Sequence, residues 1–400
     1  MSNKSLGALF FLRICLTSDS FMKQRVVIAV DSFKGSLAAH EVAKALSEGI
    51  RSAAPLYQIT ELPLADGGEG SAEIITRARG GQWVAVDVSN PLGVPITAHY
   101  GLLSADTAVL DVASAAGLTL LQAEERNPLS TSSRGVGQMI RSVLDAGCRN
   151  VIIGVGGSAT NDCATGLLSA LGYRFTDSNG GEVEPCGASL HRIATIDSSG
   201  ADHRLRNTNF TLAVDVQSPF CGAQGAAHIF APQKGATPQM VAMLDEGMAH
   251  FAEVVRAHCG VEITNIEGAG AAGGIGGALY ALLGAKLRSG ADTIMDCVGF
   301  DSLLSDCDLV ITGEGRIDHQ TLRGKLPVRV LERAGVREIP VVAVGGGVDM
   351  CAELAESGFA EIVAATPHNM PLSEAIRPEV ARQNLIRTGA EIAKKWLREP

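Results

Sequence analysis

The sequence predicts a two-domain α/β protein in which helices cover both faces of a parallel sheet. Short apolar runs alternate with segments of helical periodicity near both ends of the chain. In the middle of the chain, by contrast, three apolar runs follow one another with no helix between them. A length of 400 residues is typical of two domains, and 46 glycines supply many tight turns.

The N-terminal part opens with a strand, a helix and a second strand. Residues 26–30 form a β-branched apolar run, residues 38–53 have helical periodicity, and residues 58–64 are again extended. This βαβ pattern is typical of a Rossmann-like sheet.

The C-terminal part repeats the same alternation. We expect strands at residues 309–312, 340–344 and 361–365, and helices at residues 321–334 and 378–397. The two chain ends therefore have the pattern of one parallel sheet covered on both faces.

The middle of the chain has a different pattern. Strands at residues 84–88, 96–103 and 109–112 are separated only by turn sequences, which favours antiparallel or mixed pairing. The remaining expected elements are strands at residues 151–155 and 210–216 and helices at residues 135–146, 162–171 and 238–258.

We therefore expect residues 22–85 and 290–400 to form one domain, with residues 86–289 inserted as a second. A ligand cleft is expected where the domains meet. Residues 1–21 are interpreted as a non-essential tail, because Arg13 interrupts their apolar run and no small-x-small cleavage site follows it.

Charge and cysteine content exclude several classes of protein. The formal net charge of −10 disfavours binding to nucleic acid, although local lysines can still attract small anions. No apolar stretch reaches the roughly 18 to 20 residues of a membrane-spanning helix. The nine cysteines form neither a C-x-x-C pair nor a zinc-spaced cluster, so we expect reduced thiols in a cytoplasmic protein.

Polar turns follow the first two predicted strands, at the edge where open α/β sheets bind ligands. After the first strand, Lys34 could bind a phosphate or carboxylate, and Asp31 could bind a metal or a hydroxyl group. Ser32 and Ser36 could take part or simply cap the next helix.

After the second strand, the glycines of the Asp66-Gly67-Gly68-Glu69 turn let a ligand approach the Asp66 carboxylate closely. Glu69 could instead stabilise a helix N-terminus.

Two glycine-rich segments are candidates for anion binding. The turn at residues 156–162 could bind a phosphate through Gly156, Gly157, Ser158, Thr160 and Asn161, or be an ordinary capped turn. Residues 268–273 match G-x-G-x-x-G, but residues 261–266 make a poor preceding strand. A substrate or phosphate loop, or glycines that pack helices, is therefore favoured over an NAD site.

Two further clusters combine a carboxylate with a cation. Asp215 ends a predicted strand shortly before Lys234, and Glu314 stands two residues before Arg316. Phosphoryl transfer uses this combination, because acids hold Mg²⁺ while cations offset phosphate charge. Glu314 and Arg316 could equally form a surface ion pair.

Six motifs in this order resemble the type-1 glycerate kinase family. They are residues 31–34, 65–70, 156–162, 232–236, 268–274 and 311–316. The resemblance implies a flavodoxin-like domain with an inserted restriction-endonuclease-like domain, and phosphorylation of D-glycerate by ATP with Mg²⁺. Gln217 and Ser218, Cys163 and the Gly345-Gly346-Gly347 run depart from the usual pattern of the family.

The resemblance and the motifs together give the expected site. The expected catalytic residues are Lys34, Asp66, Asp215, Lys234 and Arg316, and Asp215 and Asp162 are expected to hold the metal. The expected binding residues are Ser32, Ser36, Gly67, Gly68, Glu69, Gly156, Gly157, Ser158, Thr160, Asn161, Gly270, Gly273, Gly274 and Glu314.

We expect 2-phosphoglycerate as the product, with 3-phosphoglycerate left open, and a monomer or homodimer that binds neither membranes nor nucleic acid. The alternatives are an NAD-dependent hydroxy-acid dehydrogenase and a non-catalytic sugar-acid-binding protein.

Overall fold

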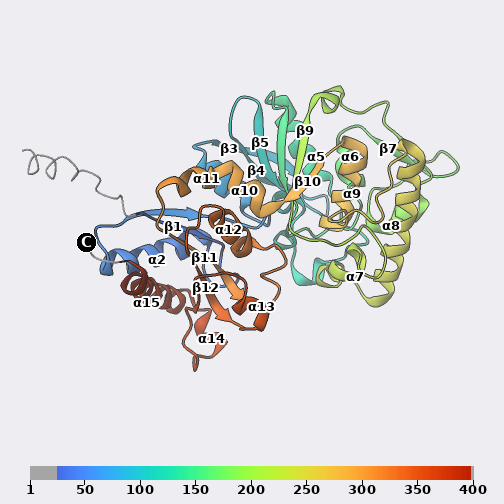
Figure 1. Cartoon of the computed structure of the whole chain (residues 1–400). Helices are drawn as coiled ribbons and strands as arrows, with labels where there is room; N and C mark the ends of the chain where they lie inside the picture. Colours follow the sequence, from blue (N-terminus) through green and yellow to red (C-terminus); the bar gives the residue numbers. More distant parts are fainter. Residues whose placement is uncertain (1–24, 398–400) are drawn as a thin grey trace, which may run out of the picture.

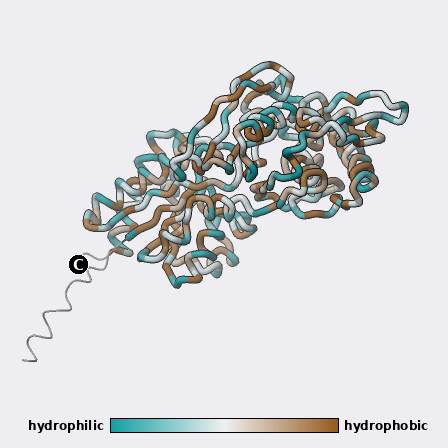
Figure 2. The backbone as a smooth tube through the Cα atoms, turned by 90° about the horizontal axis from the view of Figure 1, so that it is seen from above, coloured by the Kyte–Doolittle hydropathy of each residue, from teal (hydrophilic) through white to brown (hydrophobic). Residues whose placement is uncertain are grey.

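The computed structural model describes residues 25–397, so the predicted tail at residues 1–21 lies outside the described residues. Two large sheets, each with its own helices, form two lobes that lie side by side (Figures 1 and 2). The predicted α/β class is confirmed.

The first sheet is parallel and is made from both ends of the chain. Its strands are β1 (Arg25–Val30), β2 (Gln58–Pro63), β11 (Leu309–Ile317), β12 (Val341–Val348) and β13 (Glu361–Ala364). The order β13-β12-β11-β1-β2 is the flavodoxin order when these strands are counted along the chain. Its topological switch point, where ligands bind in such sheets, lies between β1 and β11.

Helices cover both faces of this sheet, and β1 shows why. Val26, Ile28 and Val30 point to the face where α2 (Ala39–Ala53) and α15 (Pro378–Trp396) pack. Val27 and Ala29 point to the other face, which α3 (Ser71–Ala78), α10 (Gly290–Val298) and α12 (Leu326–Gly335) cover. Since both faces are buried, the strand is an unbroken apolar run instead of an alternating one.

The second sheet is mixed, as its sequence pattern predicts. It contains β3 (Gln82–Ser89), β4 (Pro95–Leu102), β5 (Thr107–Asp111), β6 (Asn150–Gly154), β9 (Asn209–Val214) and β10 (Lys286–Ser289). The order is β10-β9-β6-β5-β4-β3, with β3, β4 and β5 antiparallel and the other pairs parallel.

The other elements complete the two lobes. The second lobe contains α4 (Ala113–Ala116), α5 (Arg134–Asp145), α6 (Thr165–Ala170), β7 (Arg174–Thr176), β8 (Thr195–Asp197), α7 (Ala226–Phe230), α8 (Pro238–Cys259) and α9 (Ala271–Leu283). The first contains α11 (Phe300–Leu303), α13 (Ala352–Ala355) and α14 (Leu372–Ala375). Among residues 25–397 no helix is long and apolar enough to cross a membrane.

Two predicted helices begin later than the sequence suggests. The helix expected from Asp162 begins at Thr165, because Cys163 and Ala164 adopt left-handed backbone angles with φ of 51° and 59°. The helix expected from Thr321 begins at Leu326, after β11 has continued to Ile317.

The division into domains remains a proposal, and β3 bears on its first boundary. This strand pairs with β4 along its whole length, from Gln82 to Ser89. A boundary between residues 85 and 86 would cut the strand, so we place the boundary before Gln82.

Candidate active site

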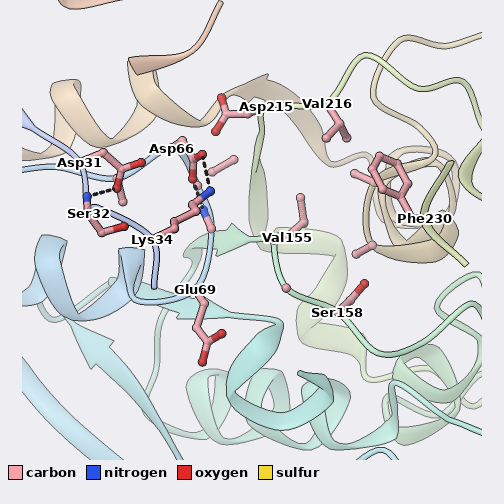
Figure 3. A pocket seen from close by; sticks show the side chains of 18 of the residues that line it. Asp31, Ser32, Lys34, Asp66, Glu69, Val155, Ser158, Asp215, Val216 and Phe230 are labelled. Carbon is pink, nitrogen blue, oxygen red and sulfur yellow. Dashed lines mark hydrogen bonds and ion pairs between the residues drawn. The ribbon is translucent and has the colours of Figure 1, made fainter. Parts of the chain in front are cut away.

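Loops from the carboxyl ends of strands in both sheets enclose a cavity of about 500 Å³ (Figure 3). The loops follow β1, β2, β6 and β9, and the Gly156 N–H donates to the Gly67 carbonyl 3.3 Å away, joining two of them. The lining residues are Asp31, Ser32, Lys34, Ala65, Asp66, Gly67, Gly68, Glu69, Val155, Gly156, Gly157, Ser158, Ala213, Asp215, Val216, Phe230, Gln233, Lys234, Ala271 and Ala272.

One side of the cavity carries an ion pair and a buried acid. Lys34 Nζ lies 3.4 Å from Asp66 Oδ2 (Figure 3), and the carboxylate raises the pKa of Lys34. The Ser32 N–H donates to Asp31 Oδ1 at 2.6 Å. Burial and then the charge of Asp66 raise the pKa of Asp31 to about 7. Two acids on this side, Asp31 and Asp66, therefore share the positive charge of one lysine.

Asp215 brings a second buried acid from the other lobe. Its Oδ1 accepts hydrogen bonds from the N–H groups of Gly290 at 2.9 Å and Ala291 at 3.4 Å, at the start of α10. Its Oδ2 is buried and has no hydrogen-bond partner among the described residues. Burial, followed by the charge of Asp66, raises the pKa of Asp215 to about 7. One oxygen is thus held in place by the backbone, while the other is left without a hydrogen-bond partner among the described residues.

Lys234 supplies a buried amine at the cavity wall. It ends a 3₁₀ turn (Pro232–Lys234) and is only 2% exposed. Its Nζ donates to Ser158 Oγ at 2.9 Å and to the Thr160 carbonyl at 2.6 Å, which fixes the loop after β6. Burial lowers the pKa of Lys234 to about 7, partly offset by the charge of Asp162. An anionic ligand in the cavity would favour its protonated form.

Asp111 holds the loop that carries Asp66, and no sequence motif pointed to it. This buried carboxylate accepts hydrogen bonds from the N–H groups of Gly70 at 2.9 Å and Ala72 at 3.2 Å, at the N-terminus of α3. Burial raises the pKa of Asp111 to about 7. Asp111 therefore positions the loop from behind, outside the cavity lining.

Three expected residues of the loop after β6 lie behind the cavity wall. Asp162 Oδ2 accepts hydrogen bonds from the N–H and Oγ of Ser133, both at 2.8 Å, and from the Gly166 N–H at 3.2 Å. Asn161 Nδ2 contacts Met248 Sδ, and Thr160 meets Lys234 through its carbonyl. None of the three lines the cavity. Their placement favours support of the loop over direct ligand or metal binding.

The segment Gly268 to Gly274 reaches the cavity through Ala271 and Ala272, not through its glycines. A Cβ at Gly270 would lie 2.3 Å from the Pro219 carbonyl, and one at Gly273 would lie 2.1 Å from the Thr160 carbonyl. A Cβ at Gly274 would lie 2.8 Å from Cys163 Sγ. These three glycines therefore allow close packing. The strand that a dinucleotide fingerprint requires is absent directly before them within the described chain.

Glu314 and Arg316 also lie outside the cavity lining. Glu314 accepts hydrogen bonds from Thr321 Oγ1 at 2.7 Å and Lys325 Nζ at 3.1 Å. The largely exposed Arg316 pairs with Asp349. Strand β11 extends through both residues, so their side chains contact segments beside this strand and do not enter the cavity. Ser36 lines a neighbouring cavity. The expected residues that line this cavity are Ser32, Lys34, Asp66, Gly67, Gly68, Glu69, Gly156, Gly157, Ser158, Asp215 and Lys234.

Phe230 and Gln233 line the cavity but were not among the expected site residues. Gln233 neighbours Lys234, so its position in the motif could have revealed it. Phe230 ends the short helix α7 and carries no motif that could have done so.

The acids suit a magnesium ion shared with a phosphate ligand. Among residues 25–397, no group of three His, Cys, Asp or Glu side chains is close enough to form a complete metal site. Magnesium is commonly bound by one or two carboxylates together with phosphate oxygens and water. The unpartnered oxygen of Asp215 and the mutual repulsion of Asp31 and Asp66 fit such a cation.

Comparisons with known proteins agree with this architecture. The model of the glycerate kinase family matches residues 26–397. A glycerate kinase of Bacillus subtilis is 42% identical over 92% of this chain and 97% of its own. A glycerate 2-kinase of Escherichia coli K12 is also 42% identical, with the same coverage of both chains.

A solved structure also matches this chain. The crystal structure of a candidate glycerate kinase 2 from Salmonella typhimurium LT2 superposes with a TM-score of 0.81 and 40% identity, covering 93% of this chain and 98% of that one. Both the sequence matches and this superposition extend across the two lobes. The chain belongs to the glycerate kinase family.

Proposed function

We propose that this protein transfers the γ-phosphoryl group of ATP to the 2-hydroxyl of D-glycerate, forming 2-phosphoglycerate in organic acid catabolism. The observation that carries the proposal is the single cavity that unites acids and lysines from both lobes: Asp31, Lys34, Asp66, Asp215 and Lys234. The names of the Bacillus subtilis and Escherichia coli relatives support glycerate as the substrate.

Asp215 is the best placed general base. Its Oδ1 is fixed by two N–H groups, its Oδ2 faces no protein partner among the described residues, and its pKa of about 7 suits proton transfer at neutral pH. In the proposed step the glycerate oxygen forms a bond to the γ-phosphorus and its proton passes to Asp215. The bond between that phosphorus and the β,γ-bridging oxygen breaks, and ADP leaves.

The lysines and the remaining acids offset the charge. Lys34 and Lys234 both line the cavity and supply positive charge for phosphate and carboxylate oxygens bound in it. Asp31 and Asp66 offer oxygen ligands to magnesium, which when bound neutralises phosphate charge. Asp215 could act at the metal instead of as the base, as expected from the sequence.

The remaining residues of the cavity lining can contact the ligand through backbone groups or polar side chains. Gly67 and Gly68 face Gly156 across the cavity wall, so backbone groups can approach a ligand closely there. Ser32, Glu69 and Ser158 offer further polar side chains for the substrate.

The test is ³¹P NMR of the protein incubated with ATP, Mg²⁺ and D-glycerate. The expected product signal is that of 2-phosphoglycerate, distinguished from 3-phosphoglycerate by comparison with both standards. The protein with Asp66 replaced by Asn is the control for contaminating kinases, since it should lose most of the signal. Consumption of NADH with tartronate semialdehyde, without phosphoryl transfer, would support the dehydrogenase alternative instead.

A further inference from the structure

A second cavity, of about 370 Å³, lies next to the first in the five-stranded lobe. Lys34 lines both cavities. The second cavity is lined by Phe33, Lys34, Ser36, Gly315, Gly346, Gly347, Val348, Asp349, Ala364, Ala365, Thr366, Pro367, His368, Met370, Leu372, Ala375, Ile376, Ala381 and Asn384. A ligand that fills both cavities would therefore pass Lys34.

The second cavity lies at the carboxyl edge of the parallel sheet. Gly315 comes from β11, Gly346 to Val348 from the end of β12, and Ala364 from the end of β13. Phe33 and Ser36 follow β1, on the other side of the switch point. Open α/β sheets bind their ligands in this position.

Apolar side chains form much of the wall of this cavity, and two of them are exposed. Leu372 is 76% exposed and Ile376 is 41% exposed, although both line the cavity. Phe33, Val348 and Met370 add further apolar surface. A flat apolar group such as a purine base would cover these side chains.

Polar groups accompany the apolar wall. Ser36 Oγ is buried without a hydrogen-bond partner among the described residues. Thr366, His368 and Asn384 offer donors and acceptors that a ribose or a base can use. The carboxylate of Asp349, already paired with Arg316, can accept hydrogen bonds from ribose hydroxyls.

We propose that this second cavity, called here the nucleoside cavity, binds the adenosine part of ATP. The triphosphate passes Lys34 and places its γ-phosphorus in the first cavity, beside Asp66 and Asp215. This inference rests on the proposed function, because it takes ATP as the phosphoryl donor and assigns its adenosine part to the nucleoside cavity. The first cavity then holds glycerate and the phosphoryl group that is transferred.

Gly347 offers a way to fill the nucleoside cavity. A Cβ at this position meets no atom within 4 Å, and its φ lies outside the left-handed region, so Gly347→Leu directs a side chain into open space. Gly335→Leu is the matched control, because a Cβ there also meets nothing within 4 Å, at the end of α12 and away from both cavities.

A second pair of variants tests the wall without filling the cavity. Leu372→Gln removes apolar surface from a side chain that is 76% exposed, so the fold should tolerate it. Leu56→Gln is the control, since Leu56 is 73% exposed and lines neither cavity.

The experiment measures binding of MgADP and of inorganic tripolyphosphate to each variant by isothermal titration calorimetry. We expect Gly347→Leu to weaken MgADP binding by about 10-fold to 100-fold and Leu372→Gln by several-fold. Neither control should change MgADP binding, and tripolyphosphate binding should stay the same in all four variants. Unchanged MgADP binding in both test variants, or an equal loss of tripolyphosphate binding, would overturn the proposal.

The same samples separate this inference from the proposed function. Wild-type protein that binds MgADP in a manner sensitive to Gly347, yet transfers no phosphoryl group to D-glycerate, supports the nucleoside cavity and refutes the glycerate kinase activity. Wild-type protein that phosphorylates glycerate while both test variants bind MgADP normally supports the activity and overturns the nucleoside cavity.

Discussion

Gly156 and Gly68 belong to loops that leave different sheets, yet a Cβ at Gly156 would lie only 2.5 Å from the Cα of Gly68. Such a distance is not tolerated between carbon atoms, and the backbone of Gly68 cannot rotate aside as a side chain could. The contact between these two loops at the cavity wall therefore requires glycine at position 156.

Gly156→Ala should separate these loops and displace Asp66 from the residues of the other lobe. Displacements of about 1 Å can cost about 10²-fold in rate, so we expect a loss of this order in kcat/KM for glycerate. Steady-state kinetics measures the effect. Gly335→Ala, whose added methyl meets nothing within 4 Å, is the control and should keep wild-type activity. Equal activity of the two variants would contradict the role of this contact.

The side chains from the three strand ends should each be needed for turnover. Lys34→Ala, Asp66→Asn and Asp215→Asn should fold normally and lose about 10² to 10³ in kcat, as expected for removal of one preorganised group. Circular dichroism and kcat together distinguish lost chemistry from lost structure. Asp306→Asn, at an exposed position away from the cavity, is the control. Near-normal turnover in any one test variant would remove that residue from the mechanism.

Arg316 provides a contrasting case within the same set of expected residues. Its guanidinium is largely exposed and pairs with Asp349 outside the first cavity. We therefore expect Arg316→Gln to lower kcat by less than about tenfold, a smaller loss than in Lys34→Ala. A loss as large as that of Lys34→Ala would restore the catalytic role expected from its motif.

The buried amine of Lys234 should control the alkaline side of the pH profile. Its pKa of about 7 means that the charge needed to hold an anion is lost as the pH rises above 7. Asp215, with a pKa of about 7, gains its charge over the same range, so kcat/KM should pass through a maximum near neutral pH. In Lys234→Arg the charge persists, and we expect the decrease at alkaline pH to disappear. The exposed Lys44→Arg is the control and should keep the wild-type profile.

The sequence could predict Lys34, Asp66 and Asp215 as residues of one cavity because each follows a strand, and open α/β sheets bind ligands at the carboxyl ends of their strands. It could not place Arg316 or Asp162. Arg316 follows the expected strand, but β11 continues through it and directs it to Asp349. Asp162 follows a glycine-rich turn, but the left-handed backbone at Cys163 turns the chain, and Asp162 bonds to Ser133.

Contacts between residues that lie far apart in the chain could not be predicted from the sequence either. The Asp111 carboxylate accepts a hydrogen bond from the N–H of Gly70, which lies 41 residues earlier in the chain. No periodicity or motif joins these two positions, because the contact arises only when β5 is placed beside the start of α3. The same holds for the nucleoside cavity, whose walls come from segments on both sides of the inserted residues.

The buried ionisable groups also predict an unusual dependence of stability on pH in the unliganded protein. Asp31, Asp111 and Asp215 have folded pKa values of about 7, against 3.8 in the unfolded chain. Between pH 4 and 7 the folded protein holds protons that the unfolded chain has released, so stability falls as the pH rises. The slope is about 1.4 kcal/mol per pH unit for each fully shifted group.

Lys234 has the opposite effect at higher pH. Its pKa is about 7 in the folded protein and 10.5 in the unfolded chain, so the unfolded chain holds the extra proton between these values. Stability should therefore rise again above pH 7, and these four groups together give a minimum near pH 7. The free energy of unfolding in urea at pH 5, 7 and 9 measures the curve. Asp111→Asn should flatten its acidic side while Asp306→Asn should not, and a wild-type protein most stable at pH 7 would contradict the pKa shifts on which the proposed base depends.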